Sequence, residues 1–460
     1  MIYHLDCESF IMESKGEMVM IRKVYASEEE FHVQNKELGE KLPFSQDLSV
    51  LSTPLDVGGK RIPNRLACQA MEGCDSAADG SPDVLTKRRY ERFAKGGAGL
   101  IWFEATAVMK EGRANPRQLY IDEQNLDQFK AQLEAIKETE IKENGYEPVV
   151  VMQVTHSGRY AKPNGIPEPL IAYHNPIFEE KTPISDDRIV SDEYLDRVKE
   201  ALIEGCNLAK RAGFDGADIK CCHRYLNSEL LSAYERPGRY GGCLENRSRF
   251  LRESVQGAIE RCGTDFLVST RMNVYDGFPY PYGFGVSSDG SLEFDPSEPA
   301  WVMKELYRYG VRLMNISMGN PYFNPHVSRP YANGSEGQEH PLQGVERILN
   351  GTAKLKQLVP EMKLICSGLS YLGVAAPHVA AALMEHGGFD VAGFGRTAFA
   401  YPDFAKDILE NGQMNPKKIC ICCSKCSEIM RTPGGTPGCV IRDPAVYLRI
   451  YQQQCGGGTK

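Results

Sequence analysis

The chain has 460 residues, of which 42% are hydrophobic, and it carries a formal net charge of −8. This length suits one large barrel or two ordinary domains, and the composition supports a sizeable core. Because the charge is acidic and no basic cluster occurs, nucleic acid and anionic membranes are excluded as main partners. The longest apolar runs, such as 148–154, are far too short to span a bilayer. The fifteen cysteines and the lack of a secretory signal predict a cytoplasmic protein with reduced thiols.

Short apolar runs alternate with amphipathic stretches along the middle of the chain, which is typical of βα units around a parallel sheet. Strands are predicted at eight places: 64–72, 97–105, 148–157, 214–222, 265–273, 311–319, 363–368 and 390–395. Helical periodicity follows them, for example at 192–212, 245–261, 299–309, 344–358 and 375–386. Eight alternations predict a (β/α)8 TIM barrel rather than an open doubly wound sheet. We expect an N-terminal extension at 1–45, the barrel at 46–412 and a separate cysteine segment at 413–460.

Three long irregular stretches, 159–191, 275–295 and 320–341, each follow a predicted strand. They therefore lie at the C-terminal face, where barrel active sites form, and we interpret them as the roof of a pocket rather than surface decoration. Their aromatic side chains suit a flat ligand: Tyr280, Tyr282, Tyr322, Phe323 and Tyr331.

The end of the fourth predicted strand carries Lys220, His223 and Tyr225 in one short segment. Tyr225 can deliver a proton, while His223 and Lys220 can hold an oxygen that gains negative charge. Structural roles are the alternative, and the position at a strand end favours catalysis. His156 and Arg271 complete a polar ring, and for these two a structural role is as well supported as catalysis.

The loops after the last two predicted strands contain Gly368 and the run Gly393-Phe394-Gly395-Arg396. Glycine lets backbone N–H groups approach a phosphate, and a following helix N-terminus adds a favourable dipole. Because such barrels bind phosphate at these two loops, the sequence predicts a phosphate site that includes Arg396.

Near the end of the chain, Cys420, Cys423 and Cys426 fall within seven residues, and Cys439 follows thirteen positions later. This spacing favours a four-cysteine iron–sulfur cluster, because structural zinc usually takes its ligands as two separated pairs. Zinc and a disulfide are the alternatives, and Cys422 shows that not every cysteine here is a ligand. The sequence therefore predicts a redox protein.

Five groups of residues along the barrel form recognisable motifs: Asn64-Arg65, Gln153 with His156-Ser157-Gly158-Arg159, His223-x-Tyr225-Leu226, Arg236-Pro237-Gly238-x-Tyr240 with Glu245-Asn246-Arg247, and Gly393-Phe394-Gly395-Arg396. With these motifs, residues 48–410 resemble the Old Yellow Enzyme family. The cysteine segment is similar to that of the iron–sulfur branch, which contains 2,4-dienoyl-CoA reductase, enoate reductases and trimethylamine dehydrogenase.

The resemblance implies FMN on the barrel and a [4Fe-4S] cluster on Cys420, Cys423, Cys426 and Cys439. Ala70, Met71 and Ala105 would line the flavin ring, Gln153 and Arg271 would bond its polar edge, and Gly368, Gly395 and Arg396 would hold its phosphate. Glu72 stands where relatives often place a small hydroxyl residue or histidine, and an inward, ionised carboxylate there should make the flavin harder to reduce. Lys220 is a second departure, because many relatives have histidine or tyrosine at its position.

The leading prediction is an ene-reductase that reduces a C=C bond conjugated to a carbonyl, with a small conjugated molecule as substrate. Tyr225 would protonate the α-carbon, and His223 with Lys220 or His326 would polarise the carbonyl. NADH, NADPH or an external electron-donor flavoprotein would supply electrons, since the sequence has no strand-borne G-x-G-x-x-G fingerprint. The alternatives are an amine dehydrogenase, against which Lys220 counts, and an electron-transfer subunit. The oligomeric state is left open, a homo-oligomer included.

Overall fold

The computed structural model describes residues 4–5, 8–12, 18–21, 24–332 and 339–455. Its centre is a closed barrel of eight parallel strands in the order β10-β11-β12-β13-β6-β7-β8-β9. The barrel strands are β6 (Leu66–Cys68), β7 (Leu100–Ala107), β8 (Val149–Thr155), β9 (Gly216–Ile219), β10 (Leu267–Tyr275), β11 (Leu313–Met318), β12 (Lys363–Cys366) and β13 (Val391–Phe394). Each lies within or overlaps a strand predicted from the sequence, so the TIM-barrel prediction is confirmed.

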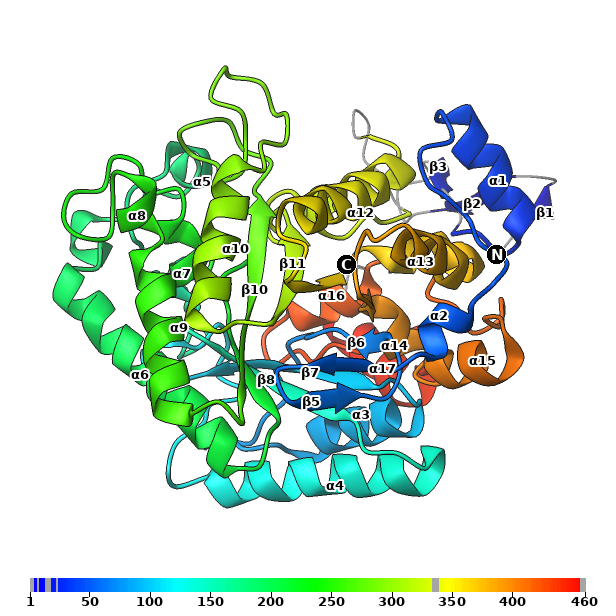
Figure 1. Ribbon diagram of the computed structural model, residues 1–460, viewed down its shortest axis with the longest axis horizontal. Coiled ribbons are helices and arrows are strands. Elements are labelled where there is room, and N and C mark those ends of the chain that lie inside the picture. The colour runs from blue at the N-terminus through cyan, green and yellow to red at the C-terminus, as the bar shows by residue number, and fades with distance from the viewer. Residues whose placement is uncertain (1–3, 6–7, 13–17, 22–23, 333–338, 456–460) are drawn as a thin grey trace.

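Helices surround the strands as an outer layer (Figure 1). The longer ones are α3 (Val84–Lys95), α4 (Leu126–Asn144), α6 (Asp192–Arg211), α9 (Arg249–Cys262), α10 (Ser297–Tyr309), α12 (Pro341–Leu358), α13 (Ala376–Glu385) and α15 (Phe404–Asn411). Shorter ones are α2 (Ser49–Ser52), α5 (Pro176–Glu179), α7 (Leu226–Leu230), α8 (Leu244–Arg247), α11 (Pro325–Ser328), α14 (Arg396–Ala400) and the 3-10 turn η4 (Leu369–Ala375). The predicted helix at 245–261 is divided between α8 and α9.

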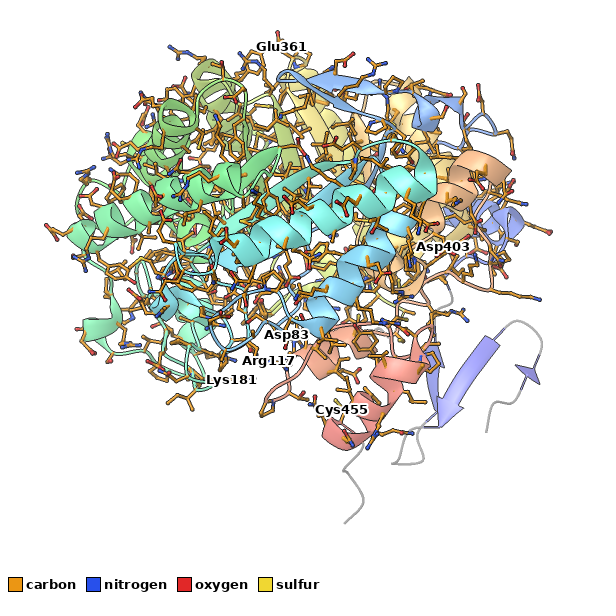
Figure 2. The ribbon with its side chains drawn as sticks, turned by 90° about the horizontal axis from the view of Figure 1, so that it is seen from below. Asp83, Arg117, Lys181, Glu361, Asp403 and Cys455 are labelled. Atoms are coloured by element: carbon orange, nitrogen blue, oxygen red, sulfur yellow. The ribbon has the colours of Figure 1, made fainter. Side chains whose placement is uncertain are left out.

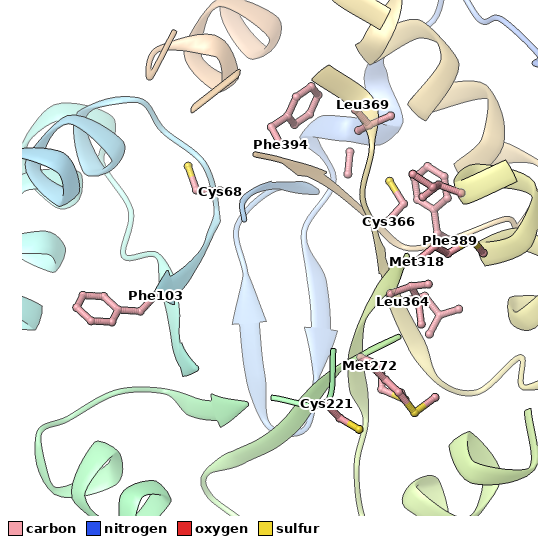
Figure 3. Close-up of a cluster of buried hydrophobic side chains, with 14 of the residues drawn as sticks. Cys68, Phe103, Cys221, Met272, Met318, Leu364, Cys366, Leu369, Phe389 and Phe394 are labelled. Atoms are coloured by element: carbon pink, nitrogen blue, oxygen red, sulfur yellow. The ribbon is translucent and has the colours of Figure 1, made fainter. Parts of the chain in front are cut away.

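Alternate residues of the barrel strands face two different cores, because successive side chains of a strand point to opposite sides. Leu100 and Trp102 of β7 belong to an inner cluster, whereas Ile101 and Phe103 belong to the outer cluster beneath the helices. Figure 3 shows part of the outer cluster, with Cys68, Phe103, Met272, Cys366 and Phe394 on the strands and Cys221 just beyond β9. Both faces of each strand are buried, which explains the near-continuous apolar runs in the sequence.

A hairpin closes the N-terminal end of the barrel. It consists of β4 (Leu55–Val57) and β5 (Lys60–Ile62), which pair antiparallel. Its side chains Leu55, Val57 and Ile62 pack in the inner cluster with the first residues of β7, β8, β10 and β11. With one end closed by this hairpin, the opposite, C-terminal end is left for a binding site.

The N-terminal extension contributes strands β1 (His4–Leu5), β2 (Glu8–Met12) and β3 (Met18–Ile21), which form a small antiparallel sheet, and helix α1 (Glu28–Glu37). Helix α1 packs against η4 of the barrel, where Phe31 contacts Tyr25 and Tyr25 contacts Tyr371 edge to face. None of the helices within the described residues is long and apolar enough to cross a membrane.

The C-terminal cysteine segment contains α16 (Lys425–Met430) and α17 (Pro444–Gln454) and lies against α3 (Figure 2). Asp443, just before α17, accepts two hydrogen bonds from Arg88 at 2.7 and 3.0 Å and a third from Arg92 at 2.6 Å. Thr436 donates at 2.5 Å to Asp75, which is buried in the loop after β6. Paired charges and a buried hydrogen bond therefore fasten the segment to the barrel.

Asp75 belongs to a buried ion network that links this loop to β7. Arg89 donates to both oxygens of Asp75 at 2.7 and 2.8 Å and to Glu104 at 2.9 Å, and Glu104 also accepts from the Gly73 N–H. Burial raises the pKa of Glu104 to about 7. The nearby Asp75 carboxylate adds to this rise, and Arg89, which the two carboxylates share, opposes it. The pKa of Asp75 is instead lowered, because Arg89 and hydrogen bonds from Thr436 and Thr86 outweigh its burial.

The raised pKa of Glu104 predicts a loss of stability as pH rises. A carboxyl with a higher pKa in the folded than in the unfolded state stabilises fully below about pH 4.5, and this contribution falls as pH rises through about 7. Glu104→Gln should abolish that decline in the free energy of unfolding, which is on the order of 2–3 kcal/mol. Denaturant unfolding at pH 5 and pH 8 measures it, with the exposed Glu91→Gln on α3 as the control. If the free energy of unfolding depended equally on pH in Glu104→Gln and in the unmodified chain, the raised pKa of Glu104 would be contradicted.

Candidate active site

Three cavities lie next to one another at the C-terminal end of the barrel and the cysteine segment. The tyrosine cavity, of about 150 Å3, is lined by Ala70, Met71, Glu72, Ala105, Gln153, Lys220, His223, Pro321, Tyr322, Arg329, Arg396, Phe399, Cys426, Ser427, Met430, Arg431 and Pro437. The glycine cavity, also about 150 Å3, is lined by Gln69, Ala70, Met71, His223, Arg271, Pro321, Ser328, Arg329, Ser367, Gly368, Ser370, Gly393, Gly395 and Arg396. The cysteine cavity is lined by Arg396, Phe399, Cys420, Ile421, Cys423, Ser424, Cys426, Cys439, Val440, Ile441 and Arg442.

The cavities share residues, so they form one site with three parts. Ala70, Met71, His223, Pro321, Arg329 and Arg396 line both the tyrosine and the glycine cavity. Cys426 lies between the tyrosine and cysteine cavities, and Arg396 borders all three. The strand ends and the cysteine segment, which are far apart in the chain, therefore meet at one site.

The segment after β9 turns sharply to present its polar side chains. His223 and Arg224 both have left-handed backbone, with φ of 63° and 59°, which costs energy for residues other than glycine. Arg224 is fully buried and holds this turn by donating to Asp276 at 2.9 Å and to the Tyr173 hydroxyl at 3.0 Å. The strain is thus maintained by a buried ion pair beside the cavities.

His223 is kept neutral. Burial lowers the pKa of its imidazole well below the usual value, and the neighbouring cations Arg271, Lys220 and Arg329 act in the same direction. Its Nε2 lies 3.2 Å from the Ser317 hydroxyl. Burial also lowers the pKa of Lys220, while nearby Glu72 opposes that shift. A neutral histidine beside a buried lysine can hold a partly negative oxygen without itself changing charge.

Tyr225 is surrounded by other polar groups. Its hydroxyl donates to Glu72 Oε2 at 2.9 Å and lies 2.9 Å from the Tyr322 hydroxyl. The Lys220 Nζ lies 3.6 Å from the centre of the Tyr225 ring and 3.9 Å from Glu72 Oε2. Burial raises the pKa of Tyr225 and Tyr322 well above the usual value for tyrosine, so both hydroxyls keep their protons. These groups can move a proton along hydrogen bonds already formed.

Asp218 was missed by sequence reasoning. It is fully buried in β9, where it accepts from the Gln153 side chain at 2.6 Å, from the Trp102 indole at 2.7 Å and from the Arg271 backbone N–H at 2.6 Å. One carboxylate therefore fixes both residues predicted to bond the polar edge of the flavin. Its signal in the sequence is weak, because the predicted strand 214–222 also carries the charges of Asp215 and Lys220.

His326 and Arg329 depart from the sequence prediction. The loop after β11 presents Tyr322 and Arg329 to the cavities, but His326 does not line any of the three. His326 lies on α11, where Glu339 and Arg347 are its charged neighbours and burial lowers its pKa. Arg329 carries no signal of its own in the sequence, because only the fold of this loop brings it to the site.

The glycine cavity has unsatisfied donors. Arg396 Nη1 and Arg271 Nε are buried without a hydrogen-bond partner within the described residues, whereas Arg396 Nη2 donates to the Pro330 carbonyl at 2.6 Å. Gly368 has a φ of 89°, which suits glycine, and a side chain on Gly393 would come within 2.2 Å of the Gln69 amide nitrogen. Buried guanidinium donors beside close-approaching backbone are the features of a phosphate site.

The four predicted cluster cysteines surround the cysteine cavity together. Backbone N–H groups donate to two of their sulfurs, from Cys422 to Cys420 at 3.4 Å and from Arg442 to Cys439 at 3.2 Å. Across the described part of the chain, no three histidine, cysteine or acidic side chains are placed to hold a single metal ion. N–H donors to cysteine sulfur are a feature by which proteins tune iron–sulfur clusters.

Comparison with known proteins identifies the family. Residues 50–415 match the NADH:flavin oxidoreductase / NADH oxidase family. The chain belongs to this family. It is a flavin-dependent oxidoreductase of the Old Yellow Enzyme type that uses NADH or NADPH, and the FMN of the family fits the donors of the glycine cavity.

The individual relatives share only 18–30% of their aligned residues with this chain. The NADPH dehydrogenase of Geobacillus sp. (strain WCH70) is 30% identical over 276 residues, which are 59% of this chain and 73% of the relative. The structure of 2-naphthoyl-CoA reductase with 2-naphthoyl-CoA superposes with a TM-score of 0.69 at 20% identity, covering 88% of this chain and 58% of that one. Histamine dehydrogenase from Rhizobium sp. 4-9 superposes with a TM-score of 0.64 at 18% identity, covering 85% and 52%. The chain thus spans little more than half of these two longer proteins, and the likeness to them establishes the fold of this flavin oxidoreductase.

Proposed function

We propose that this flavin oxidoreductase is an ene-reductase that reduces a C=C bond conjugated to a carbonyl. The observation that carries the proposal is the wall of the tyrosine cavity. There, Glu72 and Tyr322 stand beside a neutral histidine and a buried lysine, close to the glycine cavity, and Tyr225 behind them is hydrogen-bonded to both. Reduction of a conjugated alkene needs a group that donates a proton to the alkene carbon and a pair of residues that holds the carbonyl oxygen of the same substrate. These side chains supply both.

The residues that would hold FMN line the tyrosine and glycine cavities. Gly368, Gly395 and Arg396 would hold its phosphate, Gln153 and Arg271 would bond its polar edge, and Ala70, Met71, Glu72 and Ala105 would line its ring. When bound, FMN supplies the hydride for the alkene. Asp218 keeps Gln153 oriented, and Ala70 accepts from Arg271 at 3.3 Å, so the arrangement is held by contacts already formed.

His223 and Lys220 would hold the substrate carbonyl oxygen. Both line the tyrosine cavity, where Lys220 is buried and His223 is partly buried, and the hydrogen bond between His223 and Ser317 limits rotation of the imidazole. As enolate charge develops on that oxygen, Lys220 would offset it, while Glu72 balances the charge of Lys220 before that charge develops. His326, which lies outside the cavities, is no longer needed for this role.

The charges of the cavity favour a substrate that carries a carboxylate. Arg431, at the mouth, donates to the Pro321 carbonyl at 2.9 Å, and neither it nor Arg329 has an acidic partner within the described residues. With Lys220 deeper in the site and Arg396 at the border with the glycine cavity, four cationic side chains line the tyrosine cavity against one carboxylate, Glu72. An enoate would be attracted to these cations. Oxidation of an amine is the second candidate because of the fold shared with histamine dehydrogenase, and the same cations repel a protonated amine.

We also propose that Cys420, Cys423, Cys426 and Cys439 bind a [4Fe-4S] cluster. The support is their shared cavity, the N–H donors to sulfur, and Cys426, which lies next to the predicted flavin site. Such a cluster would be an inlet for electrons from an external flavoprotein when NADH or NADPH does not serve.

Anaerobic half-reactions test the proposed activity. NADH or NADPH should bleach the flavin absorbance, and 2-cyclohexenone, trans-cinnamate or crotonyl-CoA should restore it with formation of the saturated product. Trans-cinnamate, as an enoate, should reoxidise the flavin at a lower concentration than uncharged 2-cyclohexenone. Histamine and trimethylamine serve as the contrast, because an amine dehydrogenase would be reduced by them. Bleaching by an amine, together with no reoxidation by any conjugated alkene, would contradict the proposal.

A further inference from the structure

We propose that Tyr322, rather than Tyr225, is the acid that faces the substrate, and that Tyr225 and Glu72 resupply its proton. This inference rests on the proposed ene-reduction. Tyr225 has no exposed surface and does not line the tyrosine cavity. Tyr322 is partly exposed and lines it, as does Glu72. The tyrosine predicted from the sequence therefore stands behind the two groups that a ligand in the cavity would contact.

The three groups form one hydrogen-bonded line. The Tyr225 hydroxyl, which donates to Glu72 at 2.9 Å, lies 2.9 Å from the Tyr322 hydroxyl. Tyr225 is therefore the only bridge, within the described residues, that these hydrogen bonds provide between Tyr322 and Glu72. The Glu72 side chain is 10% exposed at the cavity, so its carboxyl can exchange protons with water while Tyr225 cannot.

Tyr322 is held in position by its own loop. Its backbone N–H donates to the Asn320 side chain at 2.9 Å, and the same Asn320 side chain donates to the Tyr160 hydroxyl at 2.6 Å. The Tyr160 ring packs on the Tyr322 ring with centroids 4.3 Å apart. A rigid ring keeps the hydroxyl at one place on the cavity wall, which a proton donor to a carbon atom needs.

Atoms and electrons balance along this line. The substrate C=C π bond breaks as the β-carbon receives a hydride, whose two electrons come from NADH or NADPH through FMN. The α-carbon receives the hydroxyl proton of Tyr322. The Tyr225 proton then passes to the Tyr322 oxygen, and a water molecule at the Glu72 carboxylate returns a proton to Tyr225 through that carboxylate, releasing hydroxide to solvent, so that Glu72 ends each cycle as the carboxylate it was. Lys220, 3.6 Å from the Tyr225 ring centre, stabilises the negative charge that moves through this line.

Single-turnover and steady-state kinetics distinguish the two tyrosines. In Tyr322→Phe, reoxidation of the reduced flavin by trans-cinnamate should slow by about 10²- to 10⁴-fold, whereas bleaching by NADH or NADPH changes little. In Tyr225→Phe the rate of the first turnover should stay within a few fold of the rate in the unmodified enzyme, because Tyr322 still holds its proton. The turnovers that follow should be slower. Glu72→Gln should resemble Tyr225→Phe. Tyr307→Phe, on the outer helix α10 and away from the cavity, is the matched control for removal of one hydroxyl.

A crystal structure of the oxidised holoenzyme with trans-cinnamate provides a readout independent of activity. The Tyr322 oxygen should be the phenol oxygen nearest the α-carbon, with Tyr225 beyond it. A Tyr225 oxygen nearer to that carbon, or a first turnover lost in Tyr225→Phe and retained in Tyr322→Phe, would overturn the inference alone. Failure of the unmodified enzyme to reduce any conjugated alkene would overturn the proposed function and this inference together. FMN content equal to that of the unmodified protein verifies that each variant has folded.

Discussion

Replacing Cys426 by serine should remove nearly all iron from the anaerobically purified protein, from about four atoms per chain to well below one. Cys426 borders both the cysteine cavity and the tyrosine cavity, so it is the proposed ligand next to the flavin site. Serine keeps the volume but is a poor ligand for iron. Because Ser427 and Met430 of α16, with Arg431 directly after it, also form a wall of the tyrosine cavity, loss of the cluster should weaken substrate binding as well.

Metal analysis and visible absorbance measure this result, with Cys455→Ser as the matched control. Cys455 lies in the same segment, at the end of α17, and does not line the cysteine cavity. Its iron content should equal that of the unmodified protein. Stoichiometric zinc in place of iron, or full iron retention in Cys426→Ser, would refute the proposed cluster.

Replacing Arg396 by methionine should weaken FMN binding by about 10- to 100-fold. Arg396 is partly buried at the start of α14, and its buried Nη1 has no partner within the described residues. A charge-assisted hydrogen bond to phosphate contributes about 1.5–3 kcal/mol, and each 1.4 kcal/mol is a factor of ten in affinity. Methionine fills much of the same space without a charge, so the loss measures the phosphate contact rather than a cavity.

Quenching of FMN fluorescence during reconstitution gives the dissociation constant. Arg431→Met is the control, because Arg431 lines the tyrosine cavity at its mouth and does not line the glycine cavity. It should leave FMN affinity unchanged. An unaltered dissociation constant in Arg396→Met would place the phosphate elsewhere.

Much of the fold could be predicted because the barrel depends on local patterns. Each barrel strand is short, apolar and followed by helical periodicity, and both of its faces are buried. The exact strand ends were less accurate: β6 covers Leu66–Cys68, whereas the prediction extended to 72. Beyond Cys68 the chain leaves the sheet to carry Ala70, Met71 and Glu72 into the cavities, and no local pattern marks that departure.

The site itself could be predicted only where a residue type and a strand end coincide. Lys220, His223 and Arg396 satisfy both conditions, and all three line the cavities. Tyr225 satisfies them too, yet Tyr322 from the loop after β11 covers it. His326 was selected from a loop whose path the sequence does not specify, and it lies outside the cavities.

By itself the sequence determined the barrel, the family and the four clustered cysteines, because periodicity, glycine position and thiol spacing are properties of neighbouring residues. Only the tertiary structure decided which side chains face the ligand. Asp218 orienting Gln153, Arg329 entering from a distant loop, and Glu72 meeting Tyr225 across 153 positions all depend on how separate strand ends converge. Such contacts depend on the relative placement of whole elements, which packing of the complete barrel establishes and no short stretch of sequence encodes.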